Sequence, residues 1–337
     1  MVREEGCECV MRGVVCGVLL GCGLSLLVSG CSSRSSDPHE MWDRLVAEKN
    51  ITTVAEMEVS HFSVHHFLYS SSSYSLSVYA ADSSAREVEY NIGEDGEISE
   101  RVDDDDERNA DMRWRAKANL SPDQIDFDGL VARVPAKDDP RPRCDYYRSA
   151  SLIVVPTGKM ASWTACSSSF DYHEGSLVVD GKPVNDQVDP TDPAQVASMM
   201  ESYNDIFGAG TLVQWNAGVK KGQATNVTAV PFPDDPDCRM YFSSSGRHNS
   251  MPGAGACDAP LLSDEPTIPF DLSRFSPSLV SDILVSLGSL GVQVSAIDEL
   301  IFTGTPDGKL SWKVSTMNIG DQLDYREHMH GVLEPIK

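Results

Sequence analysis

Two stretches of the chain open with the same helix-start signal and continue with apolar residues at helical spacing. Residues 37–40 read Asp-Pro-His-Glu, and residues 192–195 read Asp-Pro-Ala-Gln. Both place an aspartate at the N-cap, a proline at the first helical position and a glutamate or glutamine at the third, so that side chains can satisfy the free amides of the first turn. The apolar positions that follow are Trp42, Leu45 and Val46 in the first stretch, and Val196, Met199, Met200 and Tyr203 in the second. We predict an amphipathic helix after each cap.

A hairpin signal follows each of these predicted helices. Residues 152–159 form an apolar run with a Pro-Thr-Gly-Lys turn, and a Ser-Trp pair ending at Trp163 follows. Residues 300–309 form a similar run with a Pro-Asp-Gly-Lys turn, and a Ser-Trp pair ending at Trp312 follows. Such turns between apolar runs are typical of β-hairpins. We therefore interpret the two tryptophans as equivalent core anchors in two copies of one unit, in preference to a ligand-binding surface.

A second helix is predicted in each copy, and its register between the copies stays open. In the first copy a short helix starts near Asp126, and in the second a helix starts at residues 276–277. An alternative register matches residues 121–122, which read Ser-Pro, with the Ser-Pro pair at 276–277. Either way, each copy has the order helix, strands, helix, strands.

The strands show the alternation of an antiparallel sheet with one solvated face. Apolar residues alternate with polar ones in residues 74–78 and again in residues 88–92. We therefore predict an α+β fold with two similar domains, each with helices packed on one face of an antiparallel sheet. The first domain covers residues 37–185 and the second covers residues 191–337, with a polar, turn-rich boundary between them.

The N-terminal region resembles the export signal of bacterial lipoproteins. Residues 14–29 are apolar or small and carry no charge, which suits the core of a signal peptide and is short for a membrane-spanning helix. They end in Val-Ser-Gly before Cys31, which resembles a lipobox. The resemblance implies cleavage after residue 30, acyl chains such as palmitate on the Cys31 thiol, and a lipidated tether at residues 31–36. Three glutamates in the first ten residues suit a signal peptide poorly, and a start at Met11 would give the usual layout, so the choice between Met1 and Met11 as the start stays open.

The lipobox, the short helix before residues 152–154 and the two tryptophan strands resemble uncharacterised secreted lipoproteins of actinobacteria. Their units of a helix and an antiparallel sheet are similar to PepSY domains and to the beta-lactamase-inhibitor-protein style of fold. The resemblance extends over most of residues 37–337. It implies an architecture and a cell-envelope location, on the outer side of the membrane, and it carries over no catalytic residue.

The cysteines agree with export, because four of them remain after the lipid site. These are Cys144, Cys166, Cys238 and Cys257. Four cysteines allow three pairings. We expect Cys144 to pair with Cys166 and Cys238 with Cys257, because each pair lies in one half of the chain. A zinc site is disfavoured because it needs closely spaced thiolates, and structural disulfides are usual outside the cytoplasm.

Charge and motifs restrict the chemistry further. The formal net charge is −24, which argues against nucleic-acid binding. The motifs G-x-S-x-G and H-E-x-x-H do not occur, and we expect no catalytic residue and no cofactor. Histidines at alternate positions could supply two ligands of a metal site, but exposed polar positions on a half-solvated sheet explain them better. These weak metal candidates are His61, His65, His328 and His330.

The expected function is therefore that of a binding protein and not of an enzyme. We expect a membrane-anchored lipoprotein on the extracytoplasmic face of the cell membrane that binds or scaffolds a protein or envelope partner. The alternative is a carrier of an apolar or lipid ligand in a cavity between helix and sheet. A pocket of several hundred cubic ångströms between helix and sheet would favour the carrier.

Overall fold

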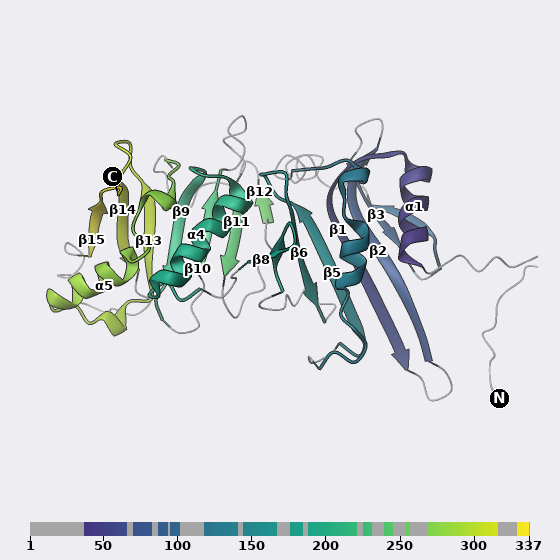
Figure 1. Ribbon diagram of the computed structural model, residues 1–337, viewed down its shortest axis with the longest axis horizontal. Coiled ribbons are helices and arrows are strands. Elements are labelled where there is room, and N and C mark those ends of the chain that lie inside the picture. The colour runs from purple at the N-terminus through teal and green to yellow at the C-terminus, as the bar shows by residue number, and fades with distance from the viewer. Residues whose placement is uncertain are drawn as a thin grey trace, which may run out of the picture. The chain divides into compact units, whose positions relative to one another are not determined.

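The computed structural model describes most of the chain after residue 36, with gaps (Figure 1). The described residues are 37–65, 70–82, 87–93, 95–101, 118–140, 144–166, 176–184, 188–220, 225–230, 239–244, 254–256, 268–315 and 329–336. The predicted signal peptide, the tether and Cys31 lie outside these ranges. Within them, no helix combines the length and the apolar character that crossing a bilayer requires.

The first half of the described chain contributes one antiparallel sheet, here called the first sheet. Its elements are α1 (Pro38–Lys49), β1 (Ile51–His65), β2 (Ser70–Asp82), β3 (Glu87–Ile92), β4 (Ile98–Arg101), η2 (Pro122–Gln124), α3 (Phe127–Arg133), β5 (Tyr147–Val154), β6 (Met160–Ala165), β7 (Val178–Val179) and β8 (Lys182–Pro183). The strands lie in the order β4-β3-β2-β1-β5-β6-β7-β8.

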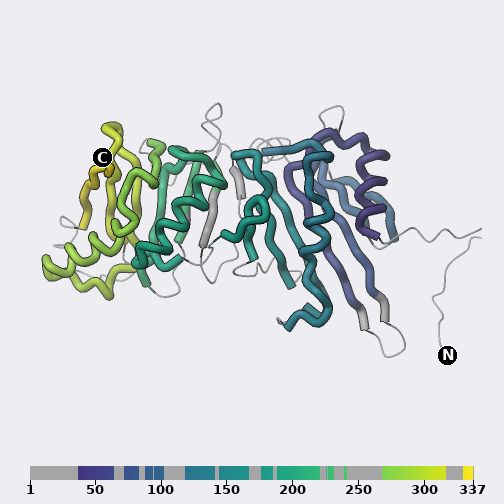
Figure 2. The backbone as a smooth tube through the Cα atoms, in the orientation of Figure 1, coloured from purple at the N-terminus to yellow at the C-terminus, as the bar shows by residue number. Residues whose placement is uncertain are grey.

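The second half contributes another antiparallel sheet, here called the second sheet (Figure 2, green to yellow). Its elements are α4 (Pro193–Phe207), β9 (Leu212–Gly218), β10 (Thr225–Ala229), β11 (Arg239–Ser244), β12 (Ala254–Ala256), η3 (Leu272–Arg274), α5 (Leu279–Ser289), η4 (Val294–Ala296), β13 (Glu299–Gly304), β14 (Leu310–Ser315) and β15 (His330–Leu333). The strands lie in the order β12-β11-β10-β9-β13-β14-β15. The chain is therefore a mixed α+β protein with antiparallel sheets, as predicted.

The two predicted Asp-Pro caps start helices α1 and α4. The carboxylate of Asp37 accepts the amide N–H of His39 at 2.8 Å, and the carboxylate of Asp192 accepts the amide N–H of Ala194 at 2.9 Å. Gln195 donates its side-chain amide back to Asp192 at 3.0 Å. These bonds satisfy donors that a helix leaves free in its first turn, which is why both helices begin at these prolines.

The second helix has the same lead-in in both halves, and this decides between the two registers. An isolated bridge joins Leu120 to β1, and another joins Phe270 to β9. Each bridge is followed by one short 3-10 turn, η2 or η3, and then by the second helix, α3 or α5. Asp126, the N-cap of α3, therefore corresponds to Ser276. The alternative register, which matched Ser121 with Ser276, is wrong.

The two hairpins share their turn, but their tryptophans are one residue out of step. In residues 155–159 and 305–309 the first amide donates to the fifth carbonyl, at 2.9 and 3.0 Å. Trp163 lies four residues after the first turn, whereas Trp312 lies three residues after the second. Side chains alternate between the two faces of a strand. When the two hairpins are aligned by their turns, the Trp163 ring and the Trp312 ring therefore lie on opposite faces of their respective sheets. The expected equivalence of Trp163 and Trp312 is therefore wrong.

Apolar side chains form two buried clusters. In the first, Met41 and Leu45 of α1 pack with Met57 and Leu76 on one face of the first sheet. The second contains the buried residues of α4, α5 and the second sheet. It also contains residues on the opposite face of β5 and β6: Ile153, Ala161 and Trp163.

Helix α4 therefore shares a core with both sheets. Its residue Asp205 also accepts a hydrogen bond from Lys159, in the β5–β6 turn, at 2.6 Å. Residues 34–337 form a single compact unit by their contacts. The predicted domains 37–185 and 191–337 are thus joined by apolar packing as well as by the chain.

Candidate functional site

The face of β1–β3 that points away from α1 carries polar and aromatic side chains. On β1, Met57 and Val59 belong to the core beneath α1. Because side chains alternate along a strand, Glu56, Glu58 and Ser60 lie on the opposite face. Helix α4 shares a core with the neighbouring strands β5 and β6, and it leaves this part of the first sheet open.

Strand pairing arranges these side chains in rows across the sheet. Glu56 pairs with Tyr79 of β2, and Tyr79 pairs with Glu89 of β3. Six residues further along β1, Phe62 pairs with Tyr147 of β5. The first row is therefore acidic with one ring, and the last row is aromatic.

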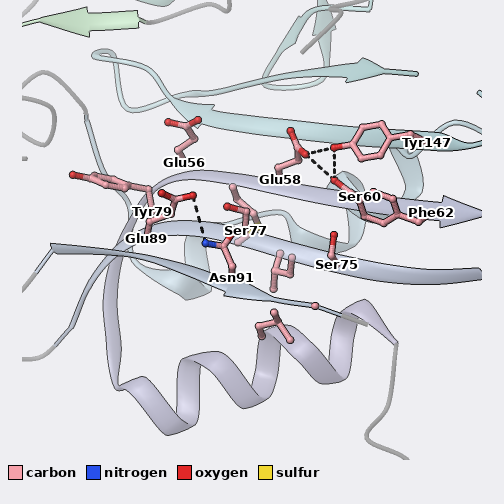
Figure 3. Close-up of a pocket in the computed structure, with 14 residues that line it drawn as sticks. Glu56, Glu58, Ser60, Phe62, Ser75, Ser77, Tyr79, Glu89, Asn91 and Tyr147 are labelled. Atoms are coloured by element: carbon pink, nitrogen blue, oxygen red, sulfur yellow. Dashed lines mark hydrogen bonds between the residues drawn. The ribbon is translucent and has the colours of Figure 1, made fainter. Parts of the chain in front are cut away.

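Small side chains between these rows create a groove of about 500 Å³. The rows in between contain Ser60, Ser75 and Ser77, whose short side chains leave the space above the strands open. Figure 3 shows the groove with Glu56, Glu89 and Tyr79 at one end and with Phe62 and Tyr147 at the other. The hollow is thus a direct result of the order acidic, serine, aromatic along β1 and its neighbours.

The carboxylate of Glu58 is held by hydroxyl groups. Its Oε1 atom accepts from the Tyr147 hydroxyl at 2.5 Å and from the Ser60 hydroxyl at 2.7 Å. Its Oε2 atom accepts from the Ser151 hydroxyl at 3.0 Å. Three hydroxyl partners from β1 and β5 fix the position of this carboxylate at the floor of the groove.

The contacts around Oε1 also constrain the protons. The hydroxyl oxygens of Ser60 and Tyr147 lie 2.8 Å from each other as well as close to Glu58. Each hydroxyl has one proton, so the two hydroxyls can fill at most two of the three contacts while Glu58 is ionised. The network therefore gains a bond if another donor reaches these oxygens.

Tyr147 stays a hydrogen-bond donor over a wide pH range. Burial raises the pKa of Tyr147 well above its usual range, and the neighbouring Glu58 carboxylate raises this pKa further. The phenol is therefore neutral at physiological pH, and it can donate to Glu58.

At the acidic end of the groove, the carboxylate of Glu89 already has partners within the chain. Glu89 accepts a long hydrogen bond from Asn91 at 3.5 Å and lies 3.7 Å from the guanidinium of Arg101. Arg101 is 65 % exposed. An exposed pair of this kind contributes little free energy, so an incoming cation can replace Arg101 at small cost.

The aromatic end offers an exposed ring. The Phe62 and Tyr147 rings meet edge to face, with centroids 4.9 Å apart. Phe62 is 38 % exposed. An apolar group that covers this ring would remove it from water, which favours binding.

The histidines predicted as weak metal candidates do not come together in the described part of the chain. A ring nitrogen of His61 lies against the Arg148 guanidinium, and its ring packs edge to face on Tyr74. Burial lowers the pKa of His61, and the Arg148 charge lowers this pKa further. The adjacent guanidinium disfavours a metal cation at His61. His330 is exposed on β15, His65 lies on β1, and His328 lies outside the described residues.

The structure contains the predicted disulfide between Cys144 and Cys166, with Cα atoms 4.5 Å apart. Among the described residues, the group of potential metal ligands consists of these two cysteines and Asp139. Since the sulfur atoms are joined to each other, they are not free thiolates. Cys238 and Cys257, like Cys31, lie outside the described residues.

A second pocket of about 330 Å³ lies between α3 and strands β5–β7. Its apolar lining includes Leu130, Leu152 and Met160. Arg133 also lines it and donates to the carbonyl of Ser176. This pocket is smaller than the groove and lies between a helix and the sheet.

Sequence reasoning identified the solvated face but missed the groove on it. Its signal was available in residues 56–62, where Glu, Glu, Ser and Phe occupy every second position. The partners Tyr79 and Tyr147 are far away in the sequence, and only strand pairing brings them to these positions.

No protein-family model matches the chain, and a search of curated proteins finds no match.

Proposed function

We propose that the chain is a membrane-anchored lipoprotein on the extracytoplasmic face of the cell membrane, and that it acts as a non-enzymatic binding or scaffold protein of the cell envelope. The groove on β1–β3 is its binding surface. The observation that carries this proposal is an open concave face that combines ordered carboxylate, hydroxyl and aromatic groups. Concave sites with a few fixed polar groups are typical of ligand binding.

The hydroxyl groups of the groove support binding better than catalysis. Ser60 and Ser151 both donate to the Glu58 carboxylate. A serine nucleophile needs a base that takes its proton, usually an imidazole. The neighbouring His61 lies on the opposite face of β1, against Arg148.

We further propose that two similar α+β units make up the described chain, each with its helices on one face of its sheet. The matching strand orders, the two bridges before the second helices and the shared turn geometry all support this duplication. The resemblance to secreted lipoproteins with repeated units agrees with it. In this arrangement the second unit packs on β5 and β6 of the first sheet, and the described residues that line the groove on β1–β3 all belong to the first unit.

The lipid anchor is tested by Cys31→Ala. This change removes the thiol that would carry the acyl chains, so the protein should leave the membrane fraction or stay unprocessed. Fractionation of cells that express the full chain measures this. A variant that is cleaved normally and stays in the membrane fraction would show that Cys31 is not the anchor.

The binding role is tested by site-specific cross-linking in intact cells. A photo-reactive side chain at Ser75, in the groove, should give a discrete cross-linked product. The matched control carries the same group at Val285, which is 74 % exposed on α5, and should give none. If neither position gives a discrete product, the groove is not a binding surface.

The alternative is a carrier of an apolar or lipid ligand, and the 330 Å³ pocket beneath α3 favours it. Mass spectrometry of the purified full chain tests this alternative, because a carrier should retain a co-purified lipid. Replacing Leu130 with tryptophan would fill the pocket and should abolish that retention.

A further inference from the structure

We infer that the groove binds an extended peptide segment of about seven residues that has a basic side chain at one end and an apolar side chain at the other, an inference that rests on the binding role proposed above. The length follows from the spacing of the rows. Glu56 and Phe62 mark the two ends and lie six residues apart on β1. At about 3.4 Å per residue, the groove extends about 20 Å along the strand.

The negative charge at one end of the groove determines that the matching end of the peptide is basic. Glu56, Glu58 and Glu89 line the groove, and its described lining contains no lysine, arginine or histidine. Tyr79 lies between Glu56 and Glu89 in the first row. A cation that enters here would meet carboxylates and the Tyr79 ring, and carboxylates together with the face of an aromatic ring recognise ammonium and guanidinium groups.

The spacing of the two carboxylates on β1 indicates that the bound cationic group is a side chain of a peptide. Glu56 and Glu58 lie on one face, two residues apart, so they are about 7 Å apart along the strand. An extended peptide that runs along β1 places its own side chains at the same interval. The Ser60 and Tyr147 hydroxyls, which share too few protons for their contacts, lie further along the same path and can accept from a peptide donor.

The aromatic end selects an apolar group. Phe62 presents an exposed ring that packs edge to face on Tyr147. Tyr147 uses its hydroxyl to hold Glu58, so its ring is fixed at this end of the groove, beside Phe62. An aliphatic side chain about six residues from the basic one would cover Phe62.

The second sheet provides an internal comparison. Ile153 of β5 corresponds to Thr303 of β13, because the turn of each hairpin follows at the same distance. Their partners on the neighbouring strands β1 and β9 are Glu56 and Gln214, respectively. By the same register, Glu58 corresponds to Asn216.

The two carboxylates of the first sheet thus have neutral amides as counterparts in the second sheet. Gln214 donates to Asn216 at 2.7 Å, so the two amides are hydrogen-bonded to each other. At these matched, described positions the acidic pair occurs in the first sheet and not in the second, so the shared strand arrangement does not require it. This difference supports a specific role for the charge.

The test uses the full chain carrying Cys31→Ala and a synthetic peptide of about seven residues, whose first and last side chains lie on the same face when it is extended. The peptide has arginine first, leucine last and alternating glycine and serine between them, with both termini blocked. Two control peptides replace the arginine with citrulline, which has the same shape without the charge, or the leucine with glycine. Calorimetry should show tighter binding of the parent peptide than of either control, by about tenfold for citrulline.

Variants of the groove, measured with the same peptides, form a double-mutant cycle that isolates the interaction between the carboxylates and the arginine. The double change Glu56→Gln and Glu58→Asn copies the second sheet and should weaken the arginine peptide about tenfold, with little effect on the citrulline peptide. Glu56→Gln alone leaves the hydroxyl network of Glu58 in place, and it should give a smaller loss in the same direction. Glu201→Gln, an equal charge change at an exposed position on α4, should have no effect.

Three outcomes would overturn the inference. The arginine and citrulline peptides could bind equally, or neither could bind, or a neutral oligosaccharide such as cellohexaose could bind in the groove instead. If cross-links form from Ser75 in cells while the peptides fail, the binding role stands and the peptide specificity is wrong. If no cross-link forms, the binding role itself fails.

Discussion

Replacing Trp163 with alanine tests whether the two halves of the chain are stabilised by one core. The Trp163 ring is 3 % exposed and belongs to the same apolar cluster as the buried face of α4. Removing a large buried aromatic side chain costs about 3–5 kcal/mol, because the loss of burial and the remaining cavity both destabilise the fold. For a unit of this size, the change corresponds to a fall in Tm of about 5–8 °C.

The location of the loss is as informative as its size. Trp163 lies on β6, in the first half, but its cluster contains Trp215 and Phe302 of the second sheet. If that core is continuous, hydrogen exchange at the amides of β9 and β13 should speed up in the variant by a factor that reflects the same loss of free energy. Val285→Ala on the exposed side of α5 is the control, and it should change the stability by less than about 0.5 kcal/mol.

The result that refutes this reasoning is a variant in which only the first half is destabilised. Thermal unfolding would then show two transitions, and the exchange rates on β9 and β13 would not change. That outcome would favour two independent domains, which would also fold separately after a cut near Asp189. From the shared cluster we expect the reverse, namely one cooperative transition and fragments that are each less stable than the intact chain.

Two further predictions concern the groove and the cysteines. The raised pKa of Tyr147 means that the folded state favours the neutral phenol and that the neutral phenol stabilises the fold. This contribution to the free energy of unfolding is complete below pH about 10, the ordinary pKa of tyrosine, and it is lost as the pH rises towards the folded-state pKa. Urea unfolding at about pH 9 and about pH 11 measures how much the free energy of unfolding falls between these two pH values. The fall should be smaller in Tyr147→Phe than in the unchanged protein, and equal falls would contradict the raised pKa of Tyr147. Non-reducing peptide mapping should join Cys144 to Cys166 and Cys238 to Cys257, because the residues next to the second pair are partners on β11 and β12. Links between the two pairs would refute this.

Local signals predicted the elements of the fold well, because they act over a few residues. The Asp-Pro caps of α1 and α4 satisfy donors within their own first turn, so the sequence alone locates these helix starts. The Gly-Lys turns likewise locate both hairpins. In contrast, the Ser-Trp pairs led to a wrong equivalence, because a one-residue shift after a turn moves a side chain to the other face of the strand.

The candidate site was less predictable, because its residues meet through long-range pairing. Glu58 and Tyr147 are separated by 89 residues in the sequence and share a hydrogen bond of 2.5 Å. Alternation on β1 reveals which residues share a face, but it does not reveal which strand lies beside them. The order β3-β2-β1-β5 had to be known before the acidic and aromatic ends could be recognised.

The difference between α1 and α4 explains why α4 packs against both sheets whereas α1 packs on the first sheet. With the two Asp-Pro caps aligned, Arg44 and Glu48 of α1 correspond to Met199 and Tyr203 of α4. Arg44, which is half-buried, and Glu48, which is exposed, lie 3.9 Å apart, whereas Met199 and Tyr203 are 0 % and 2 % exposed. Helix α4 thus has apolar residues where α1 has an ion pair, which widens its apolar face and suits a helix that packs between two sheets.

Helix α1, in contrast, can cover only its own sheet. The apolar side of α4 is occupied by β5 and β6 as well as by the second sheet, and no other helix among the described residues packs on the outer face of β1–β3. Those strands then carry polar residues on that face, as a solvated sheet requires. On this view, the wider apolar face of α4 accounts for the apolar packing between the halves, and the groove forms on the part of the first sheet that α4 does not cover.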